Sequence, residues 1–185
     1  EEAPTFSGRY FSIDKAFNQP RPVQKPHPPL MLGGSGSGLL KIAASEADIL
    51  NIIPPIFNGK DFVNDTAATL KFDSEELSKR IAMLHNFAEA VGRDPKDIEL
   101  GGMMLVSLSK DPTDEAFGQL ASQLGFPDVE SARRSPLLFM GTPDDVKRDL
   151  ESRIEQMGVT YFVLIPISPA SHEMFVSEVM PVFNT

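Results

Sequence analysis

A glycine- and serine-rich segment at residues 33–38 is the part of the chain best suited to bind a ligand. It consists of Gly33, Gly34, Ser35, Gly36, Ser37 and Gly38, between a short apolar run and a stretch with helical spacing. Glycines let a backbone approach a ligand closely, and free N–H groups at a helix start point toward an anion. The segment therefore predicts a phosphate-binding turn. Valine at position 34 is expected to block that approach and to leave the fold mostly intact.

Neither common nucleotide-binding motif is present in this segment. The dinucleotide fingerprint G-x-G-x-x-G, counted from Gly34 and Gly36, would require glycine at position 39, which is Leu39. The P-loop requires a lysine after its last glycine, and Gly38 is followed by Leu39 as well. A tight strand-to-helix turn without any ligand therefore stays open as the alternative.

The remaining groups that could react or bind phosphate are scattered. His27 precedes the first core strand and is expected to pack structurally, His85 falls inside a helix, and His172 lies near the start of the last helix. Lys60 and Lys110 follow strands and could reach a phosphate, although solvated loop lysines are common. The sequence has no Glu-x-x-His or His-x-x-x-His metal pattern and no Gly-x-Ser-x-Gly nucleophile elbow. No catalytic residue can be assigned.

Composition limits the partners of the chain. Its formal net charge is −9 and no basic stripe occurs, which argues against nucleic-acid binding. It has no cysteine, so disulfides and cysteine–zinc sites are excluded. No apolar run approaches the roughly 20 residues that span a bilayer, and the N-terminus resembles no signal peptide. We expect a cytoplasmic protein without membrane contacts, and a chain that is processed, truncated or cut from something longer because no methionine begins it.

The elements expected around the glycine segment alternate between strands and helices. Residues 6–13 are expected to form an extended arm or hairpin strand, and residues 14–29, with five prolines, an irregular lead-in. Apolar runs predict core strands at residues 30–32, 48–53, 98–109 and 159–167. A loop at residues 54–73 is long enough to be functional. Helical spacing predicts helices at residues 37–46, 73–91, 111–125, 128–134, 142–157 and 170–182.

Three of these helices have clear start signals. Asp73 with Glu76 three residues later forms a capping-box pattern, and Asp111 is followed by proline. Thr142 precedes proline and two acidic residues, the strongest start in the chain. Short apolar strands separated by helices indicate an α/β fold with a parallel sheet buried on both faces. Four strands suit either a small open sheet or half of an eight-stranded barrel.

Motifs along nearly the whole chain resemble the luciferase-like monooxygenase family. The proline segment at residues 20–29 leads into Leu-Met-Leu-Gly-Gly at 30–34, and alanines lead to Asp48 at 43–48. Further matches are Gly-Arg-Tyr-Phe at 8–11, Gly-Arg-Asp-Pro at 92–95, Met-Gly-Thr-Pro at 140–143 and Gly-Val-Thr-Tyr-Phe at 158–162. Within the family, the chain is most similar to the actinobacterial branch that uses the deazaflavin coenzyme F420.

This resemblance implies a (β/α)8 TIM barrel of the bacterial luciferase-like type, of which the chain would supply the C-terminal half, strands five to eight. Residues 1–29 would be an arm and lead-in, and residues 30–185 a single half-barrel domain. Gly33, Gly34, Ser35 and Gly36, with Ser37 and Gly38, would bind the cofactor phosphate and tail. The loop at 54–73 would be a lid.

The implied activity is hydride transfer between F420 and an unknown small organic substrate, with an FMN-dependent monooxygenase as the alternative. Catalytic residues would come largely from the N-terminal half, so the chain alone would be inactive. Half a barrel exposes two sheet edges and an apolar interior face. We therefore expect a homodimer, or a complex with a separate N-terminal half. A second alternative is a non-catalytic half-barrel that associates with itself or another chain.

Overall fold

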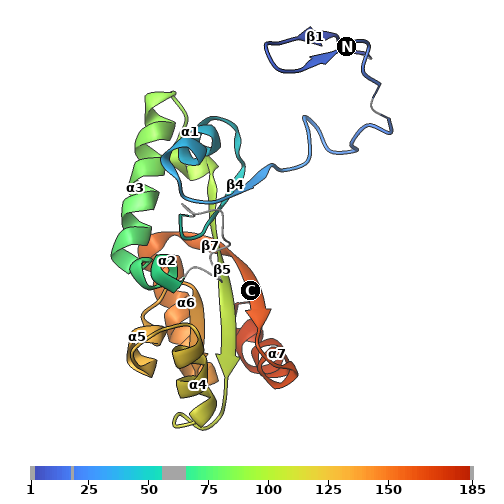
Figure 1. Ribbon diagram of the computed structural model, residues 1–185. Coiled ribbons are helices and arrows are strands. Elements are labelled where there is room, and N and C mark those ends of the chain that lie inside the picture. The colour runs from blue at the N-terminus through green and yellow to red at the C-terminus, as the bar shows by residue number, and fades with distance from the viewer. Residues whose placement is uncertain (1–2, 18, 56–65, 184–185) are drawn as a thin grey trace.

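The computed structural model describes residues 3–17, 19–55 and 66–183 (Figure 1). A parallel sheet joins β3 (Met31–Gly33), β4 (Ile49–Ile52), β5 (Glu99–Leu108), β6 (Leu138–Gly141) and β7 (Val159–Pro166). The helices are α1 (Ser37–Glu46), α2 (Thr66–Lys71), α3 (Ser74–Ala90), α4 (Glu115–Gln123), α5 (Val129–Arg133), α6 (Pro143–Met157), α7 (Pro169–Met174) and α8 (Met180–Phe183), with the short helical segments η1 (Pro95–Asp97) and η2 (Phe175–Val179). The prediction of an α/β fold with a parallel sheet is confirmed.

β5 is the central strand of the sheet. One edge of β5 pairs with β4 through residues 99–102 and with β6 through residues 105–108, while β7 pairs along the opposite edge. On the first edge, the N–H groups of Glu99 and Leu105 donate to the carbonyls of Asp48 and Leu137. The N–H of Leu108 points to the other edge, where it donates to the hydroxyl of Ser171. β3, β6 and β7 thus each pair with a single described strand.

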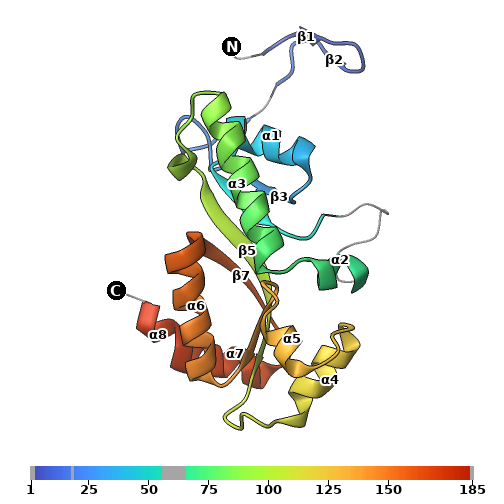
Figure 2. The same cartoon turned by 90° about the vertical axis from the view of Figure 1, so that its left-hand side faces the viewer.

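One face of the sheet is packed by helices and the other is partly exposed, so the prediction of a sheet buried on both faces is wrong. Leu50, Ile52 and Leu100 are buried against the side chains of α1 and α3, which lie side by side (Figures 1 and 2). Farther along β5, Val106 packs against α6 and η2. The opposite face carries apolar side chains that remain accessible: Met31 is 40% exposed, and Tyr161 and Ile165 are each 38% exposed.

The predicted elements are largely present, with three corrections. A helix was predicted from Asp111, but α4 begins at Glu115 because Asp114 accepts the N–H of Ala116 as its cap. Asp111 instead accepts hydrogen bonds from the N–H and hydroxyl of Thr113 and closes a turn. The strand β6 was missed because its strand character comes from its pairing with residues 105–108 of β5. The predicted loop at 54–73 contains helix α2. Residues 56–65 of that loop lie outside the described part of the chain.

The start of α6 matches its prediction. The Thr142 hydroxyl accepts the N–H of Asp145, and the Asp145 carboxylate accepts the N–H of Thr142, which makes a capping box. Gly158 ends the helix with φ +67°. The hydrogen bond from the Thr142 hydroxyl lowers the pKa of the Asp145 carboxyl below its ordinary 3.8, so the stability gained from the ionised group is lost as the pH falls below that value.

Replacement of Thr142 by alanine is expected to lower the free energy of unfolding by about 1 kcal/mol, the usual effect of removing a helix cap. The variant leaves the N–H of Asp145 without its hydroxyl acceptor. Urea denaturation of the wild type and the variant measures the change. Equal midpoints would show that α6 does not depend on this cap.

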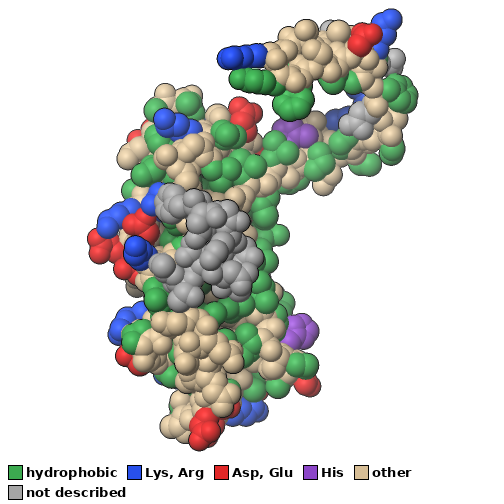
Figure 3. Space-filling model, in the orientation of Figure 1, with side chains coloured by type: hydrophobic (Ala, Val, Ile, Leu, Met, Phe, Trp, Pro, Cys, Tyr) green, Lys and Arg blue, Asp and Glu red, His purple; other side chains and the backbone are tan. Residues whose placement is uncertain are grey.

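The N-terminal arm stands apart from the body in both views (Figures 1 and 2). It contains an antiparallel hairpin of β1 (Phe6–Ser7) and β2 (Ser12–Ile13), as predicted for residues 6–13. Figure 3 shows hydrophobic side chains along this arm, and the exposed fractions of Tyr10, Phe11 and Phe17 are 77%, 80% and 78%. Across the described residues, no helix combines the length and the apolar character that crossing a bilayer requires.

Candidate functional site

The glycine segment forms the turn between the end of β3 and the start of α1. Gly34 lies at φ +141°, a conformation that side-chain-bearing residues rarely adopt, and its N–H donates to the carbonyl of Asn51 at 2.9 Å. A Cβ on residue 34 would lie 2.5 Å from Cδ2 of Leu39. The expectation that valine here leaves the fold mostly intact is therefore wrong. Such a substitution would disturb the turn itself, and it cannot isolate ligand binding.

Ser35 and Arg80 hold the turn in place through hydrogen bonds. The Ser35 side chain is buried and its hydroxyl donates to the carbonyl of Ile53 at 2.5 Å, which ties the end of β3 to the end of β4. Arg80 on α3 donates from Nη1 to the Ser35 carbonyl at 3.1 Å and pairs with Glu76. Glu76 is thus used by Arg80, whereas Asp73 alone caps α3 by accepting the N–H of Glu76. These bonds hold the backbone of the turn in one conformation.

The N-terminus of α1 is open. Gly36 occupies the cap position without a side-chain hydrogen bond, and no acidic residue lies in the first turn. The N–H of Leu40 is the first to bond within the helix, to Gly36, so those of Ser37, Gly38 and Leu39 lack intrahelical acceptors. A Cβ on Gly33, Gly36 or Gly38 would meet nothing within 4 Å. The geometry provides accessible N–H donors and a helix dipole, which together suit an anion.

The six residues predicted to bind a cofactor are therefore brought together, but they play different parts. Ser37 and Gly38 are exposed at the helix start, and Gly36 lies directly before them. Gly34 adopts the positive φ that the turn requires. Ser35 can contact a ligand only through its backbone, because its hydroxyl donates to the carbonyl of Ile53. Their role in cofactor binding stays a prediction.

The other groups considered from the sequence lie elsewhere. Lys110 is exposed and pairs with Glu178 at 3.1 Å, as fits a solvated lysine, and Lys60 lies outside the described residues. His27 is exposed, with Nδ1 2.9 Å from the carbonyl of Pro28, so the expectation that it packs structurally is wrong. His85 is half-buried on α3, and His172 is exposed on α7. Within residues 3–17, 19–55 and 66–183, no cluster of three or more His, Asp or Glu side chains could hold a metal ion.

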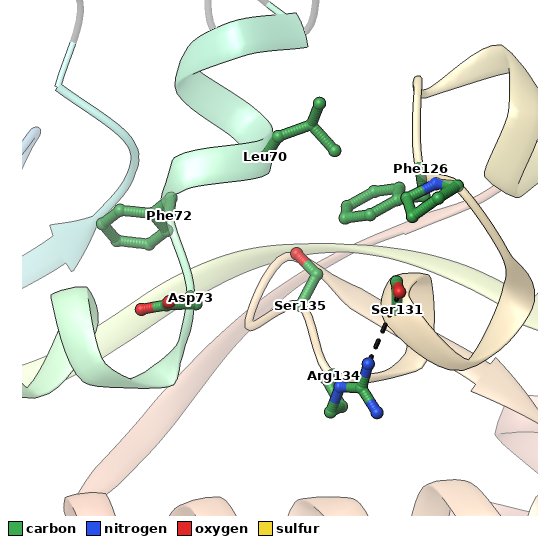
Figure 4. A pocket seen from close by; sticks show the side chains of 8 residues that line it. Leu70, Phe72, Asp73, Phe126, Ser131, Arg134 and Ser135 are labelled. Atoms are coloured by element: carbon green, nitrogen blue, oxygen red, sulfur yellow. Dashed lines mark hydrogen bonds between the residues drawn. The ribbon is translucent and has the colours of Figure 1, made fainter.

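A separate hollow of about 370 Å³ opens between the segment joining α2 to α3 and the segment around α5 (Figure 4). Its walls include apolar side chains and one cation, namely Leu70, Phe72, Phe126, Pro127 and Arg134. Arg134 already contacts Glu130 and the Ser131 hydroxyl, each at 3.4 Å. The hollow does not include the glycine turn, and we do not assign it to the same site.

The sequence did not indicate that two further residues, Arg80 and Asn51, contact the turn. Arg80 shows only the four-residue spacing to Glu76 that many surface ion pairs share, and nothing in the sequence relates it to Ser35, 45 residues away. Asn51 stands inside an apolar strand, and its carbonyl supplies the acceptor that fixes Gly34. A polar residue in an otherwise apolar strand was the available signal.

The fold is similar to that of several solved flavin- and deazaflavin-dependent enzymes. An F420-dependent secondary alcohol dehydrogenase in complex with an F420–acetone adduct aligns with a TM-score of 0.68 and 20% identity, over 98% of this chain and 56% of that one. The coenzyme F420 dependent tetrahydromethanopterin reductase from Methanopyrus kandleri aligns with a TM-score of 0.67 and 17% identity, over 97% and 58%. A riboflavin lyase with modified FMN and riboflavin aligns with a TM-score of 0.65 and 16% identity, over 98% and 48%.

These structures belong to the luciferase-like monooxygenase family, so the resemblance seen in the motifs is confirmed among structural neighbours. No family model matches the chain. No curated protein matches it in sequence either. At 20% identity or less, the likeness establishes the fold, an α/β arrangement around a parallel sheet. The chain spans about half the length of the structures that it matches.

Proposed function

We propose that this chain is the C-terminal part of a luciferase-like oxidoreductase that binds coenzyme F420, or alternatively FMN, at the turn of residues 33–38. The main support for this proposal is the uncapped N-terminus of α1, which follows the glycine turn in a fold similar to that of F420- and FMN-dependent enzymes. Both cofactors carry a phosphate group. In this proposal the N–H groups of Ser37, Gly38 and Leu39 bind the phosphate oxygens.

The residues present fit such a group. The open space around Gly33, Gly36 and Gly38 lets a phosphate approach the backbone, and no carboxylate of the first helical turn opposes it. Arg80 adds a positive charge close behind the turn, although its pairing with Glu76 offsets much of that charge. The site therefore relies on backbone N–H groups and the helix dipole.

The chemistry would be supplied by the bound cofactor, whose ring accepts or donates a hydride. The described residues of this chain would bind the cofactor through its phosphate, at the N–H groups of the turn. The substrate is a small organic molecule, and residues that transfer protons or contact the ring would lie outside the site described above.

Titration with three ligands tests this proposal. We expect the 185-residue chain to bind F420 and FMN, and to bind riboflavin, which lacks the phosphate, at least 100-fold more weakly than FMN. Quenching of cofactor fluorescence measures the affinities, and the preferred cofactor separates the F420 from the FMN assignment. Equal affinity for FMN and riboflavin would contradict a phosphate site at the turn.

We further propose that the sheet is half of a (β/α)8 barrel, so that this chain forms a homodimer or binds a separate N-terminal half. Supporting this, β3, β6 and β7 each lack a second described partner, and the face bearing Met31, Tyr161 and Ile165 is partly exposed. Unpaired edges and apolar surface favour association. A non-catalytic half-barrel whose role is association rests on the same observations.

Light scattering tests this association. We expect the mass of the particle in solution to be at least twice 20.3 kDa when mass spectrometry finds this chain alone. A monomer that melts cooperatively would contradict the half-barrel proposal and favour an independent open α/β sheet.

A further inference from the structure

Asn51 places a buried polar atom without a partner beside the glycine turn. It is the third residue of β4, between Leu50 and Ile52, whose side chains are buried against the helices, so the Asn51 side chain faces the opposite side of the sheet. Its Oδ1 atom is buried, and within the described part of the chain it accepts no hydrogen bond. Buried polar atoms are nearly always paired, because leaving one unpaired costs stability.

The neighbours of Asn51 leave room on the side of the turn. In the sheet register, Asn51 lies between Gly33 of β3 and Gly101 of β5. The space above Gly101 is taken by Tyr161, whose Cβ would lie 3.2 Å from a Cβ on residue 101. A Cβ on Gly33, by contrast, would meet nothing within 4 Å. Free space thus lies over Gly33 and not over Gly101, and the broad side-chain torsion of asparagine lets the buried carboxamide turn toward that space.

The same residue is bonded to the turn. The Asn51 carbonyl accepts the N–H of Gly34 at 2.9 Å, so the side chain of Asn51 is held about one strand spacing, ~4.8 Å, from the end of β3. A ligand whose phosphate lies at the N-terminus of α1 would pass its next atoms over Gly33. In both FMN and F420 those atoms are the hydroxyl-bearing ribityl chain.

We propose that the Asn51 carboxamide is a polyol-binding group, whose oxygen accepts a hydrogen bond from a ribityl hydroxyl of the bound cofactor. This inference rests on the function proposed above. It adds a second contact, to the ribityl chain that joins the phosphate to the ring of the cofactor. A hydroxyl that enters the space over Gly33 supplies the donor that Oδ1 lacks. The side chain then contributes to affinity for the cofactor and nothing to affinity for phosphate alone.

Replacement of Asn51 by leucine, which has a similar size and no polar atoms, tests the assignment in the 185-residue chain. We expect N51L to weaken binding of FMN and F420 about tenfold, the effect of one lost hydrogen bond to a buried group, while the affinity for inorganic phosphate stays unchanged. Without ligand, the thermal midpoint of N51L should equal or exceed that of the wild type, because the unpaired buried oxygen is gone. N86L, at an exposed position on α3, is the control and should change neither property.

Two outcomes would overturn the inference while leaving the phosphate site intact. Unchanged cofactor affinity in N51L would show that Asn51 does not contact the ligand. A lower midpoint without ligand, or a variant that fails to fold, would show that the carboxamide serves a structural partner. A wild-type chain that binds none of FMN, F420 and phosphate would instead refute the proposed function, and this inference with it.

Discussion

Replacement of Gly36 by aspartate is expected to strengthen the fold and to abolish cofactor binding. Gly36 is the cap residue of α1 at φ −65° and ψ 143°, a conformation open to any residue, and its Cβ would project into free space. Aspartate is among the best helix caps, and its negative charge interacts favourably with the positive, N-terminal end of the helix dipole. We expect the free energy of unfolding to rise by about 0.5 kcal/mol.

The same carboxylate would occupy the position proposed for the phosphate. Two like charges about 4 Å apart near a protein surface repel each other by several kcal/mol. We therefore expect the affinity of G36D for FMN and F420 to fall at least about 100-fold. G36S, a neutral cap of similar size, is the matched control and should retain binding within about tenfold. If G36D binds either cofactor as tightly as G36S, the phosphate does not lie at the start of α1.

Replacement of Arg153 by alanine is expected to lower the free energy of unfolding by about 3 kcal/mol. The Arg153 side chain is 6% exposed and pairs with Asp149 at 2.6 Å. It also donates to the carbonyls of Pro136 and Leu138, each at 2.7 Å, and lies over the ring of Phe139. Alanine would leave these acceptors and a carboxylate without their donor, next to the strand β6.

Arg134 provides a matched control for this effect. Its side chain is 68% exposed and its ion pair with Glu130, at 3.4 Å, is a surface contact. R134A should change the stability by less than about 0.5 kcal/mol, as exposed ion pairs usually do. Guanidinium denaturation of both variants measures the difference. Similar losses in R153A and R134A would contradict the view that Arg153 joins α6 to the segment preceding β6.

The parts of the fold that follow local rules could be predicted from the sequence. The start of α6 at Thr142 and its end at Gly158 depend on capping and on one left-handed residue, and both are read from neighbouring residues. The range of α1 also agrees with its prediction, because the glycine segment and the apolar spacing define it. β6 could not be predicted in this way, since its strand character comes from pairing with residues 105–108 of β5.

Long-range contacts limited the prediction of the site. The position of the turn was evident from its glycines, but the distinct parts of Gly34 and Ser35 were not, because they depend on Leu39, Asn51 and Ile53. Arg153 is likewise buried on α6, with Val146 and Leu150, at a position that no motif in the sequence singles out. Its partners are main-chain carbonyls 15 to 18 residues away, which no local pattern reveals.

The most direct test of the central claim is a titration of the ¹⁵N-labelled chain with FMN and with riboflavin, followed by amide NMR. We predict that FMN shifts the amide signals of Ser37, Gly38 and Leu39 in proportion to saturation. Riboflavin at the same concentrations should leave those three signals in place, because it has no phosphate to bind them. Amide shifts induced by FMN that avoid the start of α1, or identical shifts with both ligands, would contradict the assignment of the turn as the phosphate site.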